Sequence, residues 1–351
     1  MSYLITFLFP MKGSPDYFKR TFIFSFLFCY NTLHRPKFTG ALLPSRPQTA
    51  AESAPQIKGG IDMAQNQTAP GIILSADSTC DLDPELKERY HVNYFPLHII
   101  LEGKDYTDNV DITPEDVYQA YYDRRVLPKT SAVNVQEYID HFRPWVEAGY
   151  EVIHINLGHA LSSSYQNCCL AAEELGHVHV VDSGNLSTGT GLLVVAAGKM
   201  IAQGMDAASI ADALRARTRK CHASFVLDTL TFLHAGGRCS AVAALGANML
   251  KLKPCIQVDN RDGSMGVGKK YRGALDKVLV KYVKDELARY PDINTDLLFI
   301  THSGIPREYI DLVKKTVNDT IQFQEIHITK ASCTISCHCG PNTLGILFET
   351  R

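Results

Sequence analysis

The stretch GIILSADST, residues 71–79, decides the fold class of this chain. Its mainly apolar first six residues end at a polar Asp-Ser-Thr turn, which is typical of a buried parallel strand. Runs at residues 152–157 and 177–181 have the same character, and residues 93–101 predict one further strand. Short apolar runs of this kind favour strands that are covered on both faces.

Signals for helix starts stand between these strands. Residues 83–85 (DPE) place a capping aspartate before a proline at the first helical position and an acid near the positive end of the helix dipole. Residues 113–116 (TPED) repeat the pattern, and further helices are predicted over residues 134–148 and 162–175. Alternating strands and helices predict βαβ units, and therefore a parallel sheet with helices on both faces.

The pattern changes after about residue 183. Two helices are predicted in succession, and a longer one over residues 274–290, among shorter strands at residues 223–227, 254–258, 297–301, 324–328 and 343–349. This pattern predicts a second α/β layer with a mixed sheet. Because no low-complexity linker separates the halves, we expect two closely packed domains, residues 63–183 and 184–351.

Residues 1–62 differ in composition, with eight of the 15 phenylalanines and three acidic residues. A basic pair before ten mainly apolar residues imitates a secretory signal, but the run is too short for a membrane-spanning helix of about 20 residues. Lys58-Gly59-Gly60 can be encoded by a purine run that resembles a ribosome-binding site shortly before Met63. A misplaced start, a signal or anchor, and a native arm stay open; we expect the first, with the true N-terminus at Met63.

Charge and cysteine content narrow the class of protein. Thirty-five Lys and Arg stand against 37 Asp and Glu, which gives no electrostatic reason to expect a nucleic-acid partner. The ten cysteines show no disulfide-scaffold spacing, and a chain of this length needs no disulfides for a core. We therefore expect a cytoplasmic protein without stable membrane insertion.

Three hydroxyl-rich loops are candidates for a ligand site, because open α/β sheets bind ligands at the carboxyl ends of their strands. They are residues 77–79, 129–131 and 161–165, and they supply Thr130, Ser131 and Ser162. Hydroxyls ahead of a helix donate to an anion, together with backbone amides. The alternative is that each hydroxyl only caps a helix.

Other motifs point less clearly to chemistry. Residues 184–191 (GNLSTGTG) match neither a dinucleotide-binding nor a Walker fingerprint, and Ser162 lacks a nucleophile elbow. The thiols around His338 have the residue types of a zinc site, but adjacent residues on extended backbone point in different directions, so we predict no metal and a buried thiol cluster. Arg238 follows two glycines in a predicted tight turn, where it either docks a partner or is simply solvated.

The sequence resembles the DegV family, the fatty-acid-binding subunits of bacterial fatty-acid kinase, from Gly71 almost to Arg351. The motifs that carry the resemblance lie in family order along the chain. They are residues 76–79 (ADST), 129–131 (KTS), 161–165 (LSSSY), 180–183 (VVDS), 233–238 (LHAGGR), 267–273 (VGKKYRG) and 338–341 (HCGP).

The resemblance implies a two-domain α/β protein with a long-chain fatty acid buried between the domains. In the family the carboxylate is held by the residues that correspond to Thr130 and Ser162, with His338 implicated beside them. Ser131 adjoins this set, and Arg238 is expected to dock the partner. Two departures put loop shape and acyl-chain preference in doubt. Members often have Gln-Pro at residues 132–133, where this chain has Ala-Val, and a glycine at residue 342, where it has Asn.

The chain contains no nucleotide-binding motif, so we expect ATP to come from a separate kinase subunit. In this reading the protein is a carrier without a cofactor of its own, not an enzyme alone, and it serves acyl-phosphate formation in phospholipid metabolism. The competing hypothesis is a stand-alone small-molecule hydrolase or phosphotransferase that uses Ser162 with His338.

Overall fold

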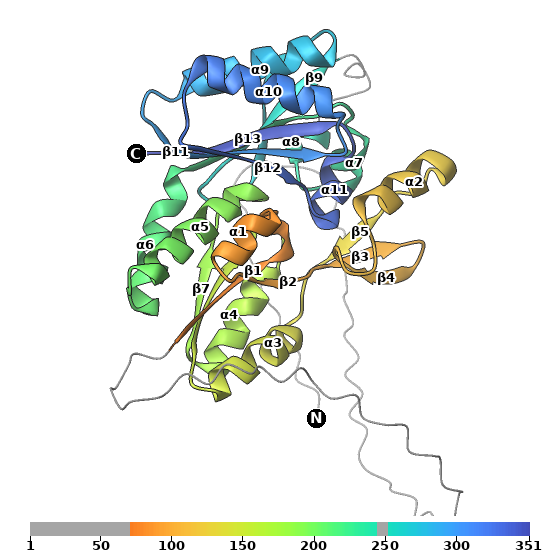
Figure 1. Cartoon of the computed structure of the whole chain (residues 1–351). Helices are drawn as coiled ribbons and strands as arrows, with labels where there is room; N and C mark the ends of the chain where they lie inside the picture. The colour runs from red at the N-terminus through yellow and green to blue at the C-terminus, as the bar shows by residue number, and fades with distance from the viewer. Residues whose placement is uncertain (1–70, 244–251) are drawn as a thin grey trace, which may run out of the picture. The chain divides into compact units, whose positions relative to one another are not determined.

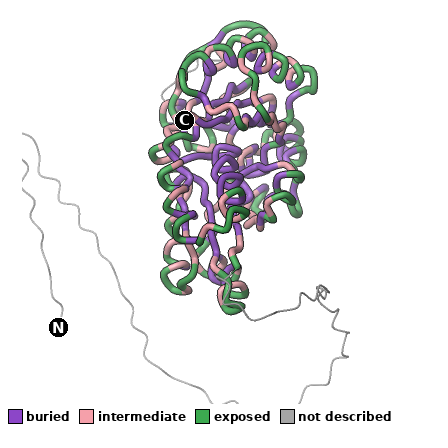
Figure 2. Tube along the Cα trace, turned by 60° about the vertical axis from the view of Figure 1, so that its left-hand side comes forward, coloured by how far each residue is buried: buried purple, intermediate pink, exposed green. Residues whose placement is uncertain are grey.

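The computed structural model describes residues 71–243 and 252–351, and the statements below concern these residues. The predictions for residues 1–62 and for a start at Met63 lie outside them. The described elements all belong to one compact unit. In Figure 2 the buried stretches of the trace lie mostly in its middle, and the exposed stretches lie mostly at its periphery.

A four-stranded sheet in the order β2-β1-β6-β7 is parallel throughout, as predicted. Its strands are β1 (Ile72–Asp77), β2 (Asn93–Phe95), β6 (Glu151–Asn156) and β7 (Val178–Asp182). Side chains alternate between its faces: Val152 packs into the core under α3 (Val135–Glu147) and α4 (Ser164–Leu175), whereas Ile153 packs with α5 (Thr188–Ala202) and α6 (Ala207–Arg217). The predicted cover of helices on both faces is therefore confirmed.

The capping residues read from the sequence make the expected hydrogen bonds. Asp83 accepts from Leu86 N at the start of α1 (Pro84–Arg89). Thr113 and Asn134 each form a reciprocal capping box, at the starts of α2 (Pro114–Arg124) and α3.

A small antiparallel sheet, β4-β3-β5, corrects two expectations. The strand expected over residues 93–101 is divided at Pro96, which lacks a backbone N–H. Its second part, β3 (His98–Leu101), pairs with β4 (Lys104–Thr107) and with β5 (Lys129–Ser131). Residues 129–131, which were expected to form a loop, are therefore a strand, with Thr130 opposite Ile99. Three residues are too few for a periodic signal in the sequence.

The second large sheet is mixed, as predicted, in the order β10-β9-β8-β13-β11-β12. Only β11 and β12 are parallel neighbours in it. Its strands are β8 (Cys221–Val226), β9 (Lys253–Val258), β10 (Met265–Tyr271), β11 (Ile293–Ser303), β12 (Glu325–Lys330) and β13 (Thr343–Thr350). One face is covered by α9 (Leu275–Arg289) and α10 (Arg307–Thr320), which lie on the outer side in Figure 1.

Helix α5 lies between the two large sheets. Its residues 192–197 share one core with Ile153 of β6 on one side and with Phe299 and Leu347 of β11 and β13 on the other. Its first eleven residues are all buried. Three short helices lie on the side of the mixed sheet opposite α9 and α10. They are α7 (Thr231–Gly236), α8 (Ser240–Ala243) and α11 (Cys333–Cys339). None of the described helices is long and apolar enough to cross a bilayer.

Candidate functional site

Two cavities meet beside helix α11. The first, which we name the strand cavity, lies over the inner side of the mixed sheet and is lined by Phe225, Leu233 and Leu347 among others. The second, the loop cavity, is bordered by β5 and by the loop before α4. The two cavities adjoin each other, because they share four lining residues; these are Leu186, Met265, Ile335 and His338.

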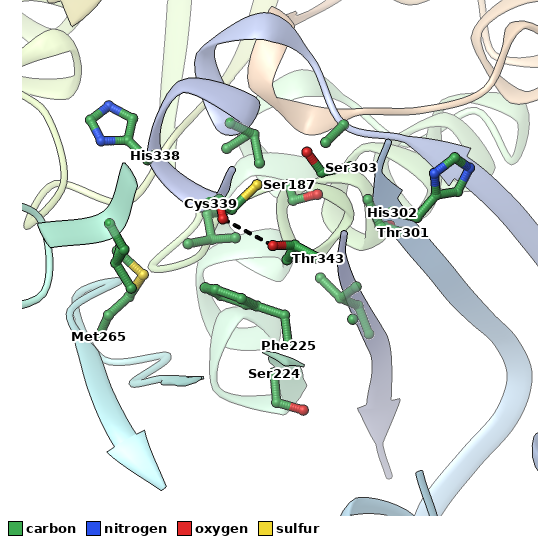
Figure 3. Close-up of a pocket in the computed structure, with 16 residues that line it drawn as sticks. Ser187, Ser224, Phe225, Met265, Thr301, His302, Ser303, His338, Cys339 and Thr343 are labelled. Atoms are coloured by element: carbon green, nitrogen blue, oxygen red, sulfur yellow. Dashed lines mark hydrogen bonds between the residues drawn. The ribbon is translucent and has the colours of Figure 1, made fainter. Parts of the chain in front are cut away.

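The strand cavity has apolar walls although many serines and threonines line it. Their hydroxyls are engaged within the protein: Ser224 Oγ lies 2.9 Å from Tyr282 Oη, and Thr343 Oγ1 donates to the Cys339 carbonyl at 2.9 Å (Figure 3). Thr301 Oγ1 likewise lies 2.6 Å from Thr188 Oγ1. Because these hydroxyls already have partners, the cavity offers a ligand mainly carbon atoms. Nδ1 of His302 and Nδ1 of His338, two residues that also line it, have no hydrogen-bond partner in the described part of the chain.

The loop cavity brings together the four residues named for the carboxylate and the one named for partner docking. Thr130, Ser131, Ser162, Arg238 and His338 all line it. Thr130 Oγ1 lies 2.9 Å from Nε2 of His338, although 208 residues separate them in sequence. Ser162 Oγ lies 2.9 Å from Ser164 Oγ and accepts from the Ser164 backbone N–H at 3.2 Å.

His338 lies on α11, which corrects the expectation of extended backbone for residues 337–339. Burial and the positive charge of Arg238 lower the pKa of His338 to about 4, so the imidazole is neutral at pH 7. Its Nδ1 atom is buried and has no hydrogen-bond partner in the described part of the chain. The ring therefore faces Thr130 as an uncharged group with one donor and one acceptor nitrogen.

The geometry does not form the nucleophile and base pair of a hydrolase. Ser162 Oγ is bonded to Ser164, and Nε2 of His338 is bonded to Thr130; within residues 71–243 and 252–351 no hydrogen bond joins Ser162 to His338. An activated serine needs its base within hydrogen-bond reach. Ser162 and His338 are therefore not paired as nucleophile and base in the described part of the chain.

Arg238 borders the loop cavity from the end of α7. Its Nε donates to the Leu161 carbonyl at 3.2 Å and its Nη1 to the Gly236 carbonyl at 2.8 Å. The residue is nevertheless exposed. The turn after α7 is therefore hydrogen-bonded to the loop at Leu161 beside the cavity, and the partner-docking role of Arg238 stays a prediction.

Hydrogen bonds of Val133 connect the two segments that border the loop cavity, β5 and the loop before α4. Its backbone N–H donates to Ser164 Oγ at 3.2 Å, and its carbonyl accepts from Asn167 Nδ2 at 2.7 Å. A proline at residue 133, common in the family that the sequence resembles, has no N–H for the first bond. The Ala-Val departure thus brings a hydrogen bond that links the Thr130 strand to the Ser162 loop.

The third hydroxyl-rich loop, residues 77–79, lines neither cavity. Asp77 is buried and accepts from the Leu157 backbone N–H at 2.8 Å, and Ser78 Oγ donates to Asp108 at 2.7 Å. These residues stabilise the carboxyl end of β1 instead.

The cysteines of α11 are buried free thiols. Burial raises the pKa of Cys333 and of Cys339 to about 12, so both stay protonated. In the described part of the chain no three His, Cys, Asp or Glu side chains are grouped as metal ligands.

The sequence did not predict the apolar residues that line the strand cavity. Leu186, Met265 and Ile335 come from three distant segments, and nothing in the local pattern distinguishes them from other core residues.

Comparison with known proteins places this architecture. Residues 72–351 match the family model described as an uncharacterised protein of the DegV family. A DegV domain-containing protein of Clostridium perfringens is 26% identical over 279 residues, which cover 79% of this chain and 98% of the relative.

Two solved structures are similar over 80% of this chain. A DegV family protein from Thermus thermophilus, described for its fatty acid binding, has a TM-score of 0.73 at 26% identity, with all of that chain covered. A stearic acid-binding protein from Eubacterium ventriosum has a TM-score of 0.65 at 25% identity, with 98% of that chain covered. The match spans both large sheets and the helices between them, and the chain therefore belongs to the DegV family.

Proposed function

We propose that this protein is a carrier that binds one long-chain fatty acid and presents its carboxylate to a separate, ATP-dependent kinase subunit in the cytoplasm. The observation that carries the proposal is that an apolar cavity adjoins one lined by hydroxyls, with four residues common to both linings. Residues 63–183 and 184–351 act in it as two domains with the lipid between them. Fatty acid binding by the two structural relatives supports the same ligand class.

The acyl chain occupies the strand cavity in this proposal. An acyl chain of about 15 methylenes gains on the order of 10 kcal/mol gross from burial, at about 0.8 kcal/mol for each methylene and before ordering costs. The engaged hydroxyls of Ser224, Thr301 and Thr343 support this position, because they leave carbon atoms facing the ligand.

The carboxylate lies in the loop cavity, held by Thr130 and Ser162, with Ser131 and His338 beside them. Neutral donors orient a carboxylate without a full countercharge, so one oxygen stays nucleophilic toward a phosphoryl donor. The low pKa of His338, about 4, supports this, because a neutral imidazole adds no countercharge at pH 7. Arg238 is then the one cationic side chain among the described residues that line this cavity.

The phosphoryl donor comes from the partner in this proposal, and the product is an acyl phosphate for phospholipid metabolism. The carrier itself needs no cofactor. The absence of a Ser162–His338 hydrogen bond in the described chain supports the carrier over the stand-alone hydrolase.

Mass spectrometry of an organic extract from the purified full-length chain tests the ligand class. We expect about one fatty acid per chain, and palmitate titration of delipidated protein should restore it. An empty protein that takes up no palmitate and turns over small esters would overturn the carrier and favour the hydrolase. Acyl-phosphate formation with ATP and a fatty-acid kinase subunit then tests the partner.

A further inference from the structure

Two buried carboxylates meet the start of helix α11, which carries His338. Asp81 Oδ1 accepts from the backbone N–H of Ser332 at 2.9 Å, and Asp108 Oδ1 accepts from the backbone N–H of Cys333 at 2.8 Å. Asp81 is 4% exposed and Asp108 is 1% exposed. The first N–H groups of a helix have no partner within it, so these carboxylates satisfy them from outside.

The second oxygen of each aspartate is also engaged. Asp81 Oδ2 accepts from Ser187 Oγ at 2.6 Å, and Asp108 Oδ2 accepts from Ser78 Oγ at 2.7 Å. Ser187 lines the strand cavity. Each carboxylate is thus fixed between α11 and a second element, and Asp81 connects α11 to a wall of the strand cavity.

Both ends of α11 are bonded to the same small sheet. Asp108 directly follows β4 and holds the first turn, whereas Thr130 of β5 bonds His338 in the last turn. Strand β3 pairs with both β4 and β5. His338 follows Cys333 by five residues, about 7.5 Å along the helix axis, so a shift of the first turn moves the imidazole directly.

We propose that Asp81 and Asp108 are positioning residues for the candidate site: they fix α11 along its axis so that His338 meets Thr130 at the head-group end of the ligand. They act through the helix and do not touch the ligand. This inference rests on the proposed function and goes beyond it, because it assigns residues outside both cavities.

A double-mutant cycle tests the inference through ligand binding. Asp108→Asn replaces one accepting oxygen by an NH2 group, which cannot accept from both Cys333 N and Ser78 Oγ. We expect palmitate to bind about fivefold more weakly, within the range of measured coupling between neighbours. Hexadecanol, which lacks the carboxylate, should bind unchanged. In a His338→Ala background, Asp108→Asn should cause no further loss.

Asp206→Asn is the matched control for the cycle. Asp206 also accepts a helix N-terminal N–H, from Ser209 at 2.9 Å at the start of α6, but it lines neither cavity. We expect its variant to bind palmitate like the unmodified chain. Equal losses for palmitate and hexadecanol, or the same loss with and without His338, would show a general structural role and overturn the inference.

A ligand-free measurement keeps the inference separate from the proposed function. The ring nitrogen chemical shifts of 15N-labelled His338 report its bond to Thr130, and we expect them to change in Asp108→Asn and in Asp81→Asn. If Asp108→Asn does not fold, Ser78→Ala removes only the donor to Asp108 Oδ2 and serves instead. Unchanged shifts in folded variants overturn the inference, whereas an unmodified chain that binds no palmitate overturns the proposed function alone.

Discussion

The backbone of Gly236 lies directly against the imidazole of His338: a Cβ atom added at Gly236 would stand 2.2 Å from Nδ1. A carbon cannot approach a ring nitrogen so closely, so a Gly236→Ala variant must displace the ring. We expect Nε2 to move away from Thr130 and palmitate to bind several-fold more weakly, in line with a lost hydrogen bond of about 1 kcal/mol.

Gly266→Ala is the control for this substitution, because no atom lies within 4 Å of a Cβ added there. Calorimetric titration with palmitate and a crystal structure of each variant check the prediction. An unmoved His338 and an unchanged affinity in Gly236→Ala would contradict it.

Thr130→Ala and Ser162→Ala each remove one donor to the proposed carboxylate. A hydrogen bond to a charged group contributes roughly 1.5–3 kcal/mol, so head-group binding should weaken about tenfold or more. Lipid occupancy should fall less than acyl-phosphate formation with a kinase subunit, because the tail supplies most of the binding. Ser163→Ala is the control, since Ser163 is exposed and makes no side-chain cap bond. Unchanged phosphorylation in both variants would refute the assignment.

Phe225→Leu should alter which acyl chain is bound. The ring lines the strand cavity, and a smaller side chain there leaves more room for the tail. We expect the fatty acids extracted from the variant to shift toward longer chains, at a cost of about 1 kcal/mol in stability. Phe299→Leu is the control: Phe299 is fully buried in the same sheet but lines neither cavity. A similar shift in both variants would show a general effect of core loosening.

Asp81→Asn should change how stability depends on pH. Burial raises the pKa of the Asp81 carboxyl from 3.8 to about 7. Between these values the unfolded chain releases the proton while the folded chain keeps it, so the free energy of unfolding falls as the pH rises from about 4 to about 7. Asparagine does not titrate. As the pH rises across this window, the free energy of unfolding of the variant should therefore increase relative to that of the unmodified chain, by up to about 4 kcal/mol.

Urea unfolding of both chains from about pH 4 to about pH 8 measures this difference. The exposed Asp206→Asn variant controls for loss of a capping carboxylate. A difference between Asp81→Asn and the unmodified chain that stays constant with pH would mean that Asp81 ionises normally in the folded state.

Arg238→Ala tests the expected partner contact. If the guanidinium docks the kinase, bound lipid and melting temperature should stay nearly unchanged while the apparent Michaelis constant for the carrier rises. Arg307→Ala, at an arginine on α10 whose side chain is 73% exposed, is the control. Loss of lipid in Arg238→Ala would instead assign the residue to the loop cavity, as its bond to Leu161 allows.

The features that the sequence predicted well are local ones. Asp83, Thr113 and Asn134 cap helices that begin immediately after them, and their hydrogen-bond partners are three residues away. The apolar runs in β1 and β6 likewise carry their own signal, because strands covered on both faces are rich in apolar residues. Such signals lie within a few consecutive residues, so a single sequence suffices to find them.

The features that could not be predicted are tertiary. Nothing in the sequence distinguishes Asp81 or Asp108 from an ordinary aspartate in a turn. Only the folded chain shows that both are buried and accept hydrogen bonds from the start of α11. The strand character of Thr130 depends on pairing with β3, whose own start is set by the break at Pro96. Motif resemblance nominated Thr130 and His338 together, but residue spacing alone cannot bring two groups 208 positions apart into contact.

Helix α5 packs against both large sheets, so we expect the two sheets to unfold together. It is buried on the side of each sheet, so unfolding either sheet would expose one flank of an apolar helix to water. Heat or denaturant should therefore melt both sheets in one cooperative transition. Leu347 of the mixed sheet packs with α5 and also lines the strand cavity. A ligand in that cavity should therefore raise the melting temperature of the parallel sheet as much as that of the mixed sheet.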